Sequence, residues 1–406
     1  MKTSFTRRKL MGAVVSASII AASAASAQDT FKVGSINPYS GPLALYGGEV
    51  TRGYELAADA VNAAGGILGK PVEIVRGNAT NPQEGIAAVE QLATRDNVEV
   101  FIGTYLSAVA GAASETALNY NKLYWDTNAL ASVLTERGLP NFVRSGPYAA
   151  TFAQVSVELI VEKIANELGK APADLTVWIE HEDSVYGSSI AEYQKESLEA
   201  AGVQVVGVGE HSFRAIDLTD SVLRAKDTNP DVWLNTGYVP DGNLLLRTAA
   251  DQRFVPPVIV FVGTGDTAET LEAMGAEGVE QLLVVSYPRP EISDEFGPGS
   301  DAYLAAYRAK YGEDPIAPQS MSAFVGFKMM AEAINRAGSA DSAAVAGVLS
   351  SFDDPVRTYE TGFGALFDEN KQNVRAFPTV IQWQDGKQVT VFPEDAAGGA
   401  MMRIGG

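Results

Sequence analysis

Cysteine is absent from this sequence of 406 residues, and histidine occurs only twice. Without cysteine the chain cannot form a disulfide framework or a thiolate metal site. The two histidines, His181 and His211, stand apart and each lies beside acidic residues. A hydrolytic triad would need one of them as its base, and no G-x-S-x-G, H-E-x-x-H or P-loop motif occurs. We therefore expect solvated or structural histidines, no metal site, no cofactor and no enzyme activity.

Basic residues are scarce as well. The chain contains 30 Lys and Arg residues and 50 Asp and Glu residues, which gives a formal net charge of −20. Such a surface repels nucleic acid and anionic lipid, so neither is expected as a partner. The fold must be stabilised by buried apolar area, and 46% of the residues are hydrophobic. The length of the chain predicts two domains.

Long apolar runs are missing, apart from a short one near the N-terminus. The first ten residues carry four bases and no acid, residues 10–22 are apolar or small, and Ala25-Ser26-Ala27 forms a small-x-small cleavage site. This layout predicts a signal peptide over residues 1–27, cleaved after Ala27, and a periplasmic protein. A transmembrane anchor, the alternative, would need about 20 apolar residues. Residues 6–11 also resemble the twin-arginine export motif, so the export route stays open.

Strand-like runs alternate with helical patterns along most of the chain. Strands are predicted over residues 31–36, 72–75, 98–102, 123–125, 175–179, 203–208, 231–235, 258–262 and 282–286. Helices are predicted over 51–64, 108–119, 151–168, 188–201, 241–252, 300–311, 319–337 and 342–349. Repeated βα units predict an α/β fold of two doubly wound parallel-sheet lobes that face a central cleft. Ligands of such sheets bind beyond the carboxyl ends of the strands.

Local signals predict how some elements begin and turn. Asn81-Pro82-Gln83-Glu84 reads as an N-cap, an N1 proline and a capping-box acid that open a helix, and Asp217 reads as the cap of another. Near the end of the chain, Asp385-Gly386 separates two strand-like runs. This dipeptide predicts a β-hairpin with a type I′ turn, because both of its residues accept a positive φ angle.

Residues 263–268, GTGDTA, fit the looser dinucleotide fingerprint G-x-G-x-x-A after a predicted strand. The segment lies far inside the chain instead of in the first βα unit, where that fingerprint belongs. A dehydrogenase or a hydrolase built on the same lobes is thus a weak alternative, which a turnover assay with NAD would expose.

Several segments resemble a known family. SGPLALYG at residues 40–47 is similar to S-G-P-x-A-x-Y-G, which follows the first strand of periplasmic leucine–isoleucine–valine-binding proteins, and NAAGGILG at 62–69 resembles their N-A-x-G-G-I-x-G. Further matches, in the family's order, are residues 102–103, 134–138, 186–187, 237–241 and 362–364. The resemblance covers residues 31 to 385. It implies a type I periplasmic-binding fold with a hinge, in which residues 29–148 and 287–358 form lobe one, and 149–286 and 359–406 form lobe two.

The resemblance also implies a ligand site. Ser107 stands where the family places a serine whose hydroxyl, with the N–H groups opening the helix at Ala108, would bind a ligand carboxylate. The ordinary alternative is an N-cap serine. Tyr46, Tyr186 and Tyr238 match aromatic residues that line the cleft. Taken without the family, each tyrosine would more often be a core or rim residue.

The chain departs from the family at two positions. Leu130, in Asn128-Ala129-Leu130, stands where amino-acid binders carry a threonine, and Asp266 lies about one position after their ammonium-binding glutamate. Asp266 has an alternative role as N-cap of a helix around 267–274. With Tyr105 and Trp125, Leu130 would make the wall of lobe one apolar and aromatic. A small amino acid, branched-chain or related, is the favoured ligand, and an aromatic or other organic carboxylate is the alternative.

The resemblance implies the substrate-binding component of an ABC importer. The protein would be a monomer that closes its lobes on a small carboxylate-bearing ligand and presents the closed form to a permease in the inner membrane. A sensor for signalling, which shares this fold, is the alternative in another class.

Overall fold

The computed structural model describes Met1 and residues 29–404. The predicted signal peptide, cleavage site and twin-arginine motif lie outside the described residues. The strands are β1 (Phe31–Asn37), β2 (Val72–Asn78), β3 (Val100–Gly103), β4 (Tyr124–Asp126), β5 (Phe142–Arg144), β6 (Thr176–Glu182), β7 (Gln204–His211), β8 (Val232–Thr236), β9 (Val258–Val262), β10 (Leu283–Ser286), β11 (Thr379–Gln384) and β12 (Lys387–Phe392).

Thirteen α-helices are assigned within the described residues: α1 (Ala44–Ala63), α2 (Pro82–Gln91), α3 (Ser107–Asn119), α4 (Val133–Glu136), α5 (Ala149–Glu158), α6 (Ala165–Glu167), α7 (Val185–Ala200), α8 (Thr219–Thr228), α9 (Val239–Asp251), α10 (Ala268–Val279), α11 (Ser300–Tyr311), α12 (Gln319–Ala337) and α13 (Ser342–Val348). A π-helical segment, Leu159–Ile164, joins α5 to α6, where the sequence predicts one uninterrupted helix. Another, Leu92–Asp96, extends α2, and the 3-10 turns Pro172–Asp174 and Leu349–Ser351 complete the helical segments.

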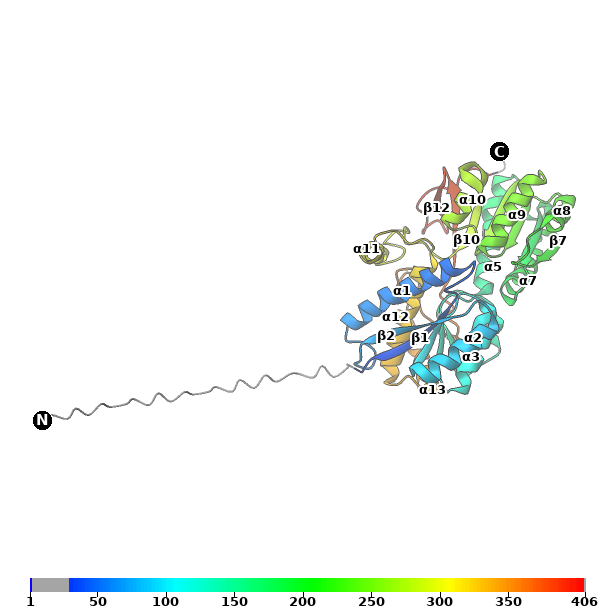
Figure 1. Ribbon diagram of the computed structural model, residues 1–406. Helices are drawn as coiled ribbons and strands as arrows, with labels where there is room; N and C mark the ends of the chain where they lie inside the picture. The colour runs from blue at the N-terminus through cyan, green and yellow to red at the C-terminus, as the bar shows by residue number, and fades with distance from the viewer. Residues whose placement is uncertain (2–28, 405–406) are drawn as a thin grey trace.

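The first sheet has five parallel strands in the order β2-β1-β3-β4-β5. Its two faces are both covered, as the apolar character of β1 and β3 requires. On one face Tyr54 of α1 and Phe327 of α12 pack with Trp125. On the other, Val89 of α2 and Val109 of α3 pack with the opposite side chains of the sheet. Figure 1 shows this layered unit below a second one.

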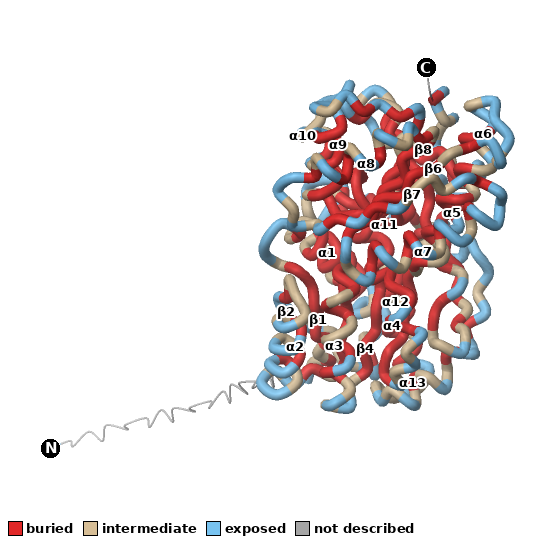
Figure 2. Tube along the Cα trace, turned by 90° about the vertical axis from the view of Figure 1, so that its right-hand side faces the viewer, coloured by how far each residue is buried: buried red, intermediate tan, exposed pale blue. Residues whose placement is uncertain are grey.

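The second sheet has seven strands in the order β12-β11-β10-β9-β8-β6-β7. Its first five strands along the chain are parallel, whereas β11 and β12 run antiparallel as a hairpin on the β10 edge. Asp385 and Gly386 in the turn both have positive φ angles, 51° and 71°, so the predicted hairpin is confirmed. The α/β fold of two parallel-sheet lobes is confirmed too, and buried chain runs through the centre of both (Figure 2).

The chain passes from one unit to the other three times. It leaves the five-stranded sheet after β5, returns after β10 to place α11 and α12 beside α1 and α13 on α12, and crosses again to form β11. A parallel bridge pairs Arg144 with Gln372, and Phe363 and Phe367 pack in the core of the first unit. We therefore propose two lobes with the last boundary after Ala376, later than the 358/359 boundary expected from the resemblance.

Two local predictions need correction. Helix α1 begins at Ala44 instead of residue 51, because Gly47 lets the helix pass directly over Pro38, where an added Cβ would lie 2.0 Å from the carbonyl oxygen. Asn81 caps α2 as predicted, since its side chain accepts from Glu84 N–H at 3.0 Å. The Glu84 carboxylate, however, accepts from the N–H and hydroxyl of Thr80, so the capping box is not formed as expected.

No helix in residues 29–404 is both long enough and apolar enough to cross a membrane.

Candidate functional site

A small cavity lies between the two sheets, at the carboxyl ends of their strands. It has a volume of only about 10 Å³ and is lined by Tyr105, Asn128, Leu130, Tyr186, Tyr238, Gly263, Tyr287 and Gln319. Each of them lies in the loop that follows a strand or at the beginning of a helix. This is where parallel sheets present loops and free helix N–H groups to a ligand. The predicted residues Tyr105, Asn128, Leu130, Tyr186 and Tyr238 are thus brought together around one space.

Stacked tyrosine rings join the two lobes beside this cavity. Tyr46 of α1 stacks on Tyr105 with 4.5 Å between ring centroids and an interplanar angle of 7°. Tyr238, from the second lobe, lies 5.8 Å from Tyr105 and 5.1 Å from Tyr186. Burial raises the pKa of all four hydroxyls well above the ordinary value, so the rings are neutral.

The hydroxyl of Tyr186 points away from the cavity, into the second lobe, which carries Tyr186. It donates to the carbonyl oxygens of Val262 at 3.1 Å and Gly237 at 3.3 Å, which leaves the ring as the surface that lines the cavity. Gly263 is required here, because an added Cβ would lie 2.0 Å from that hydroxyl. The glycines of the segment 263–268 thus serve packing against Tyr186 and Phe261, not the approach to a pyrophosphate.

Ser107 is the first residue of α3 and not its N-cap, which is Leu106. Its Oγ accepts from Leu130 N–H at 3.1 Å and from Ala131 N–H at 3.2 Å. Because both lone pairs are used, the hydroxyl can act on a third group only as a donor, which suits a carboxylate. Ser107 is buried and does not line the cavity itself, but it fixes Leu130, which does.

Two buried charges hold the loop after β4 that carries Asn128 and Leu130. The carboxylate of Asp126 accepts from the N–H groups of Thr104, Asn128 and Ala129, and the guanidinium of Arg144 donates to the carbonyl oxygens of Ala129 and Ala131. Burial raises the pKa of Asp126 to about 7 although Arg144 opposes the rise. Burial also lowers the pKa of Arg144 to about 10. Nothing in the sequence had indicated this clamp.

Asp266 lies between the lobes and is 1% exposed. Its Oδ1 accepts from the Tyr46 hydroxyl at 2.9 Å, and its Oδ2 accepts from the Ser286 hydroxyl at 2.5 Å. The alternative role as a helix N-cap is wrong, because Thr267 is the N-cap of α10 and has no capping side-chain bond. Among residues 29–404, no Lys, Arg or His forms an ion pair with Asp266.

The prediction for Trp125 is wrong. Its side chain points to the opposite face of the first sheet from Tyr124 and Asp126, because side chains alternate along a strand. There it packs on Phe367 and donates from Nε1 to the Ser145 hydroxyl at 2.9 Å. The lobe-one wall of the cavity therefore contains Tyr105 and Leu130 without Trp125.

Three lining residues were not predicted. Tyr287 directly follows β10 and donates to the carbonyl oxygen of Asn128 at 2.7 Å. The rule that ligand-facing residues follow strand ends would have found it, as well as Gly263 after β9. Gln319, the first residue of α12, had no such signal because the element before it is the helix α11 and not a strand.

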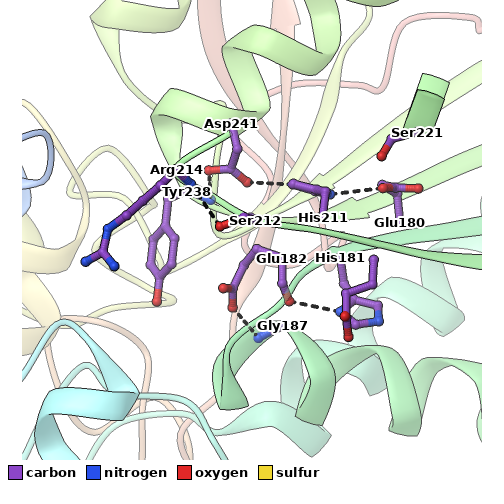
Figure 3. A network of polar contacts seen from close by, with 12 residues as sticks. Glu180, His181, Glu182, Gly187, His211, Ser212, Arg214, Ser221, Tyr238 and Asp241 are labelled. Atoms are coloured by element: carbon purple, nitrogen blue, oxygen red, sulfur yellow. Dashed lines mark hydrogen bonds and ion pairs between the residues drawn. The ribbon is translucent and has the colours of Figure 1, made fainter. Parts of the chain in front are cut away.

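A buried ionic network stands behind Tyr238 (Figure 3). The His211 ring lies between Glu180 Oε1, 3.0 Å from Nδ1, and Asp241 Oδ2, 3.0 Å from Nε2. Burial alone would lower the pKa of His211, but the hydrogen bonds to the two carboxylates raise it to about 9. Asp241 also accepts from Tyr238 N–H at 3.0 Å, so the network fixes the first turn of α9. His211 is therefore a structural residue.

The other histidine also has a local role, since His181 Nδ1 lies 2.9 Å from the carbonyl oxygen of Glu182. Within the described part of the chain, no three His, Asp or Glu side chains are arranged to hold a metal ion.

Comparisons with known proteins agree on one family. The model of the periplasmic binding protein family matches residues 30–388. The Leu/Ile/Val-binding protein homolog 7 of Brucella suis is 38% identical over 384 residues, which cover 94% of this chain and 96% of that protein.

Solved structures share the fold. The branched-chain amino acid transporter substrate binding protein LivJ from Streptococcus pneumoniae, in complex with isoleucine, has a TM-score of 0.74, 22% identity, and coverage of 89% of this chain and 98% of that chain. A solute binding protein of an ABC transporter from R. palustris, in complex with 4-hydroxybenzoate, has a TM-score of 0.75, 21% identity, and coverage of 89% and 96%.

Proposed function

Because this chain belongs to the periplasmic binding protein family, we propose that it is the substrate-binding component of an ABC importer. It is exported as a monomer, cleaved after Ala27, and captures a small amino acid between its two lobes for a membrane permease. The Brucella suis relative, named as a Leu/Ile/Val-binding protein homolog, supports the amino-acid class. No catalytic step belongs to this function.

The observation that carries the amino-acid proposal is the state of Asp266. This carboxylate is buried at the contact between the lobes, and within residues 29–404 its hydrogen-bond donors are the neutral hydroxyls of Tyr46 and Ser286. A buried carboxylate is costly unless a cation and hydrogen bonds compensate it. The ammonium group of an amino acid supplies that cation when the lobes close around it.

The carboxylate end of the ligand belongs on the first lobe. There the Ser107 hydroxyl has only its proton left to donate, and the first turn of α3 presents free N–H groups at the positive end of the helix. Leu130 and the rings of Tyr105 and Tyr186 then cover the body of the ligand. In this structure the cavity leaves room for only about 10 Å³, far less than the roughly 300 Å³ or more of small-molecule sites, so the lobes must separate before any ligand can enter.

A second candidate ligand is an aromatic carboxylate. The ring stack of Tyr46 and Tyr105, with Tyr186 and Tyr238 opposite, offers aromatic faces to a flat ligand. The R. palustris structure with 4-hydroxybenzoate shows that one protein of this fold takes such a solute. In this case Asp266 would only bridge the lobes.

The test is isothermal titration calorimetry of amino acids and benzoates with Asp266→Asn. This change keeps an oxygen that can accept a hydrogen bond and removes the charge, so we expect amino-acid binding to weaken by ~2–5 kcal/mol. Binding of a carboxylate without an ammonium group should change much less. The control is Asp217→Asn, at an exposed position far from the cavity. If Asp266→Asn binds amino acids normally, the ammonium site does not exist and the aromatic class replaces it.

A further inference from the structure

Within the described part of the chain, the side chain of Gln319 carries an unpaired polar atom in the wall of the cavity. This residue opens α12, is 1% exposed, and lines the cavity together with Asn128 and Tyr287. Its backbone carbonyl accepts from Asn128 Nδ2 at 3.4 Å. The side-chain Oε1, however, is buried and has no hydrogen-bond partner in residues 29–404.

The polar neighbours of Gln319 are already engaged. The Asn128 Oδ1 accepts from the Thr127 hydroxyl at 2.6 Å, and the Tyr287 hydroxyl donates to the Asn128 carbonyl oxygen at 2.7 Å. Across the cavity, the Tyr186 hydroxyl is turned to backbone oxygens. The Oε1 of Gln319 is therefore an uncommitted acceptor in a wall formed largely by aromatic rings and Leu130.

We infer that Gln319 is a specificity-determining residue, which binds a second polar group of the ligand in addition to its carboxylate. This inference rests on the proposed capture of a small carboxylate and narrows its class. The ligand carries a hydroxyl or an amide on its side chain or ring, and a purely aliphatic amino acid is a poorer ligand.

The physical reason is the cost of an unpaired buried amide. When the lobes close over an aliphatic side chain, the Gln319 amide loses water and gains no partner. A ligand of the same shape with a hydroxyl or amide at that point restores the hydrogen bond. Sites that hydrogen-bond a ligand group reject the isostere without it far better than apolar pockets reject an added methylene. We expect a preference of roughly tenfold or more for the polar member of an isosteric pair.

Three isosteric pairs test this by calorimetry: valine and threonine, leucine and asparagine, 4-methylbenzoate and 4-hydroxybenzoate. The wild-type protein should bind the polar member of at least one pair roughly tenfold more tightly. In Gln319→Met, which keeps the size of the side chain and removes its amide, that preference should disappear or reverse. Binding of the aliphatic member should stay equal or improve.

A matched control comes from another buried glutamine. Gln194 of α7 also has an unpaired Oε1 but lies outside the cavity, so Gln194→Met should leave every preference unchanged. If melting curves show that Gln319→Met does not fold, Gln319→Leu replaces it, because it also removes the amide at a similar size, and it should abolish the preference as well.

Two failures are distinguishable. If the protein binds these carboxylates without preferring the polar member of any pair, or if Gln319→Met keeps the preference, Gln319 bonds only to water and the inference is wrong. If no carboxylate binds at all, the proposed function fails and the inference fails with it.

Discussion

Buried carboxylates near the cavity differ in what neutralises them. Those of Glu180 and Asp241 share His211, whereas in the described part of the chain that of Asp266 accepts from two hydroxyls and from no cation. An imidazole with a carboxylate at each nitrogen must carry both protons, since a bare nitrogen would face an acceptor. His211 is therefore a permanent cation of the fold at neutral pH, and Asp266 remains available for a cation from outside.

The charge of His211 should be visible in the pH dependence of stability. Its folded pKa of about 9 lies above the ordinary value of 6.5, so its contribution is fully present below pH 6.5 and is lost as the pH rises through about 9. The free energy of unfolding should fall on the order of 3 kcal/mol across this window. Urea denaturation from pH 6 to 10 measures it.

His211→Gln should flatten this pH profile, because it removes the titrating group. The control is His181→Gln, since the His181 ring contacts a backbone carbonyl oxygen and no carboxylate. An equally steep profile in His211→Gln would show that other groups cause the pH dependence.

At the scale of single residues, the sequence indicated lining residues of the cavity mainly in loops that follow strands. The family match indicated Tyr46, Tyr186 and Tyr238, and of these Tyr186 and Tyr238 line the cavity, together with Tyr105. Trp125 was misplaced because a sequence gives the alternation of a strand but not which face meets the cleft. Gln319 could not be predicted, since it comes from a remote helix whose position depends on the tertiary fold.

The elements around the cavity depend on one buried arginine. Arg144, at the end of β5, bonds to two carbonyl oxygens of the loop after β4, to Gln372 and to Thr135. It thus ties that loop to a segment more than 200 residues away in the sequence. Without Arg144, these acceptors and the nearby Asp126 would be buried without their cation.

Arg144→Met should therefore lower the free energy of unfolding by about 3–5 kcal/mol, the usual result of removing one member of a buried charge pair. Ligand affinity should fall too, because the loop that carries Leu130 loses its anchor. Urea denaturation and calorimetry measure the two effects. Lys195→Met, which breaks an exposed pair with Glu199, should cost less than about 0.5 kcal/mol. If the two variants lost a similarly small free energy of unfolding, Arg144 would not hold the loop after β4.

Whole elements were predicted better than their ends. The helices Ser300–Tyr311 and Gln319–Ala337 and the strand Val258–Val262 have the expected bounds, because apolar periodicity and flanking turns agree there. The early start of α1 depends on the close contact of Gly47 with Pro38. The apolar periodicity of the helix does not reveal this contact. The last lobe boundary lies later than expected for a similar reason. It depends on the bridge between Arg144 and Gln372, and no pattern in the neighbouring sequence predicts that bridge.

At the scale of the molecule, contacts such as the bond of Tyr46 to Asp266 exist only when the lobes are closed. We expect the free protein to open and the ligand to close it. A ligand at a hundredfold excess over Kd should add about 2.7 kcal/mol of stability. Small-angle scattering should show a smaller radius of gyration with ligand. Saturation measured by calorimetry without any change in dimensions would contradict lobe closure.

The three crossings of the chain also determine when each half can be completed. Helix α1 packs against α12, and the two helices are separated by about 250 residues of sequence. The bridge between Arg144 and Gln372 also joins residues far apart in the sequence. Strand β10 pairs with β11, which comes about 90 residues later in the chain. Non-local pairings of this kind slow folding, because long loops must close before their contacts can form. During synthesis the first half therefore stays unfinished until the last elements emerge, and neither lobe can be produced alone by cutting the gene once.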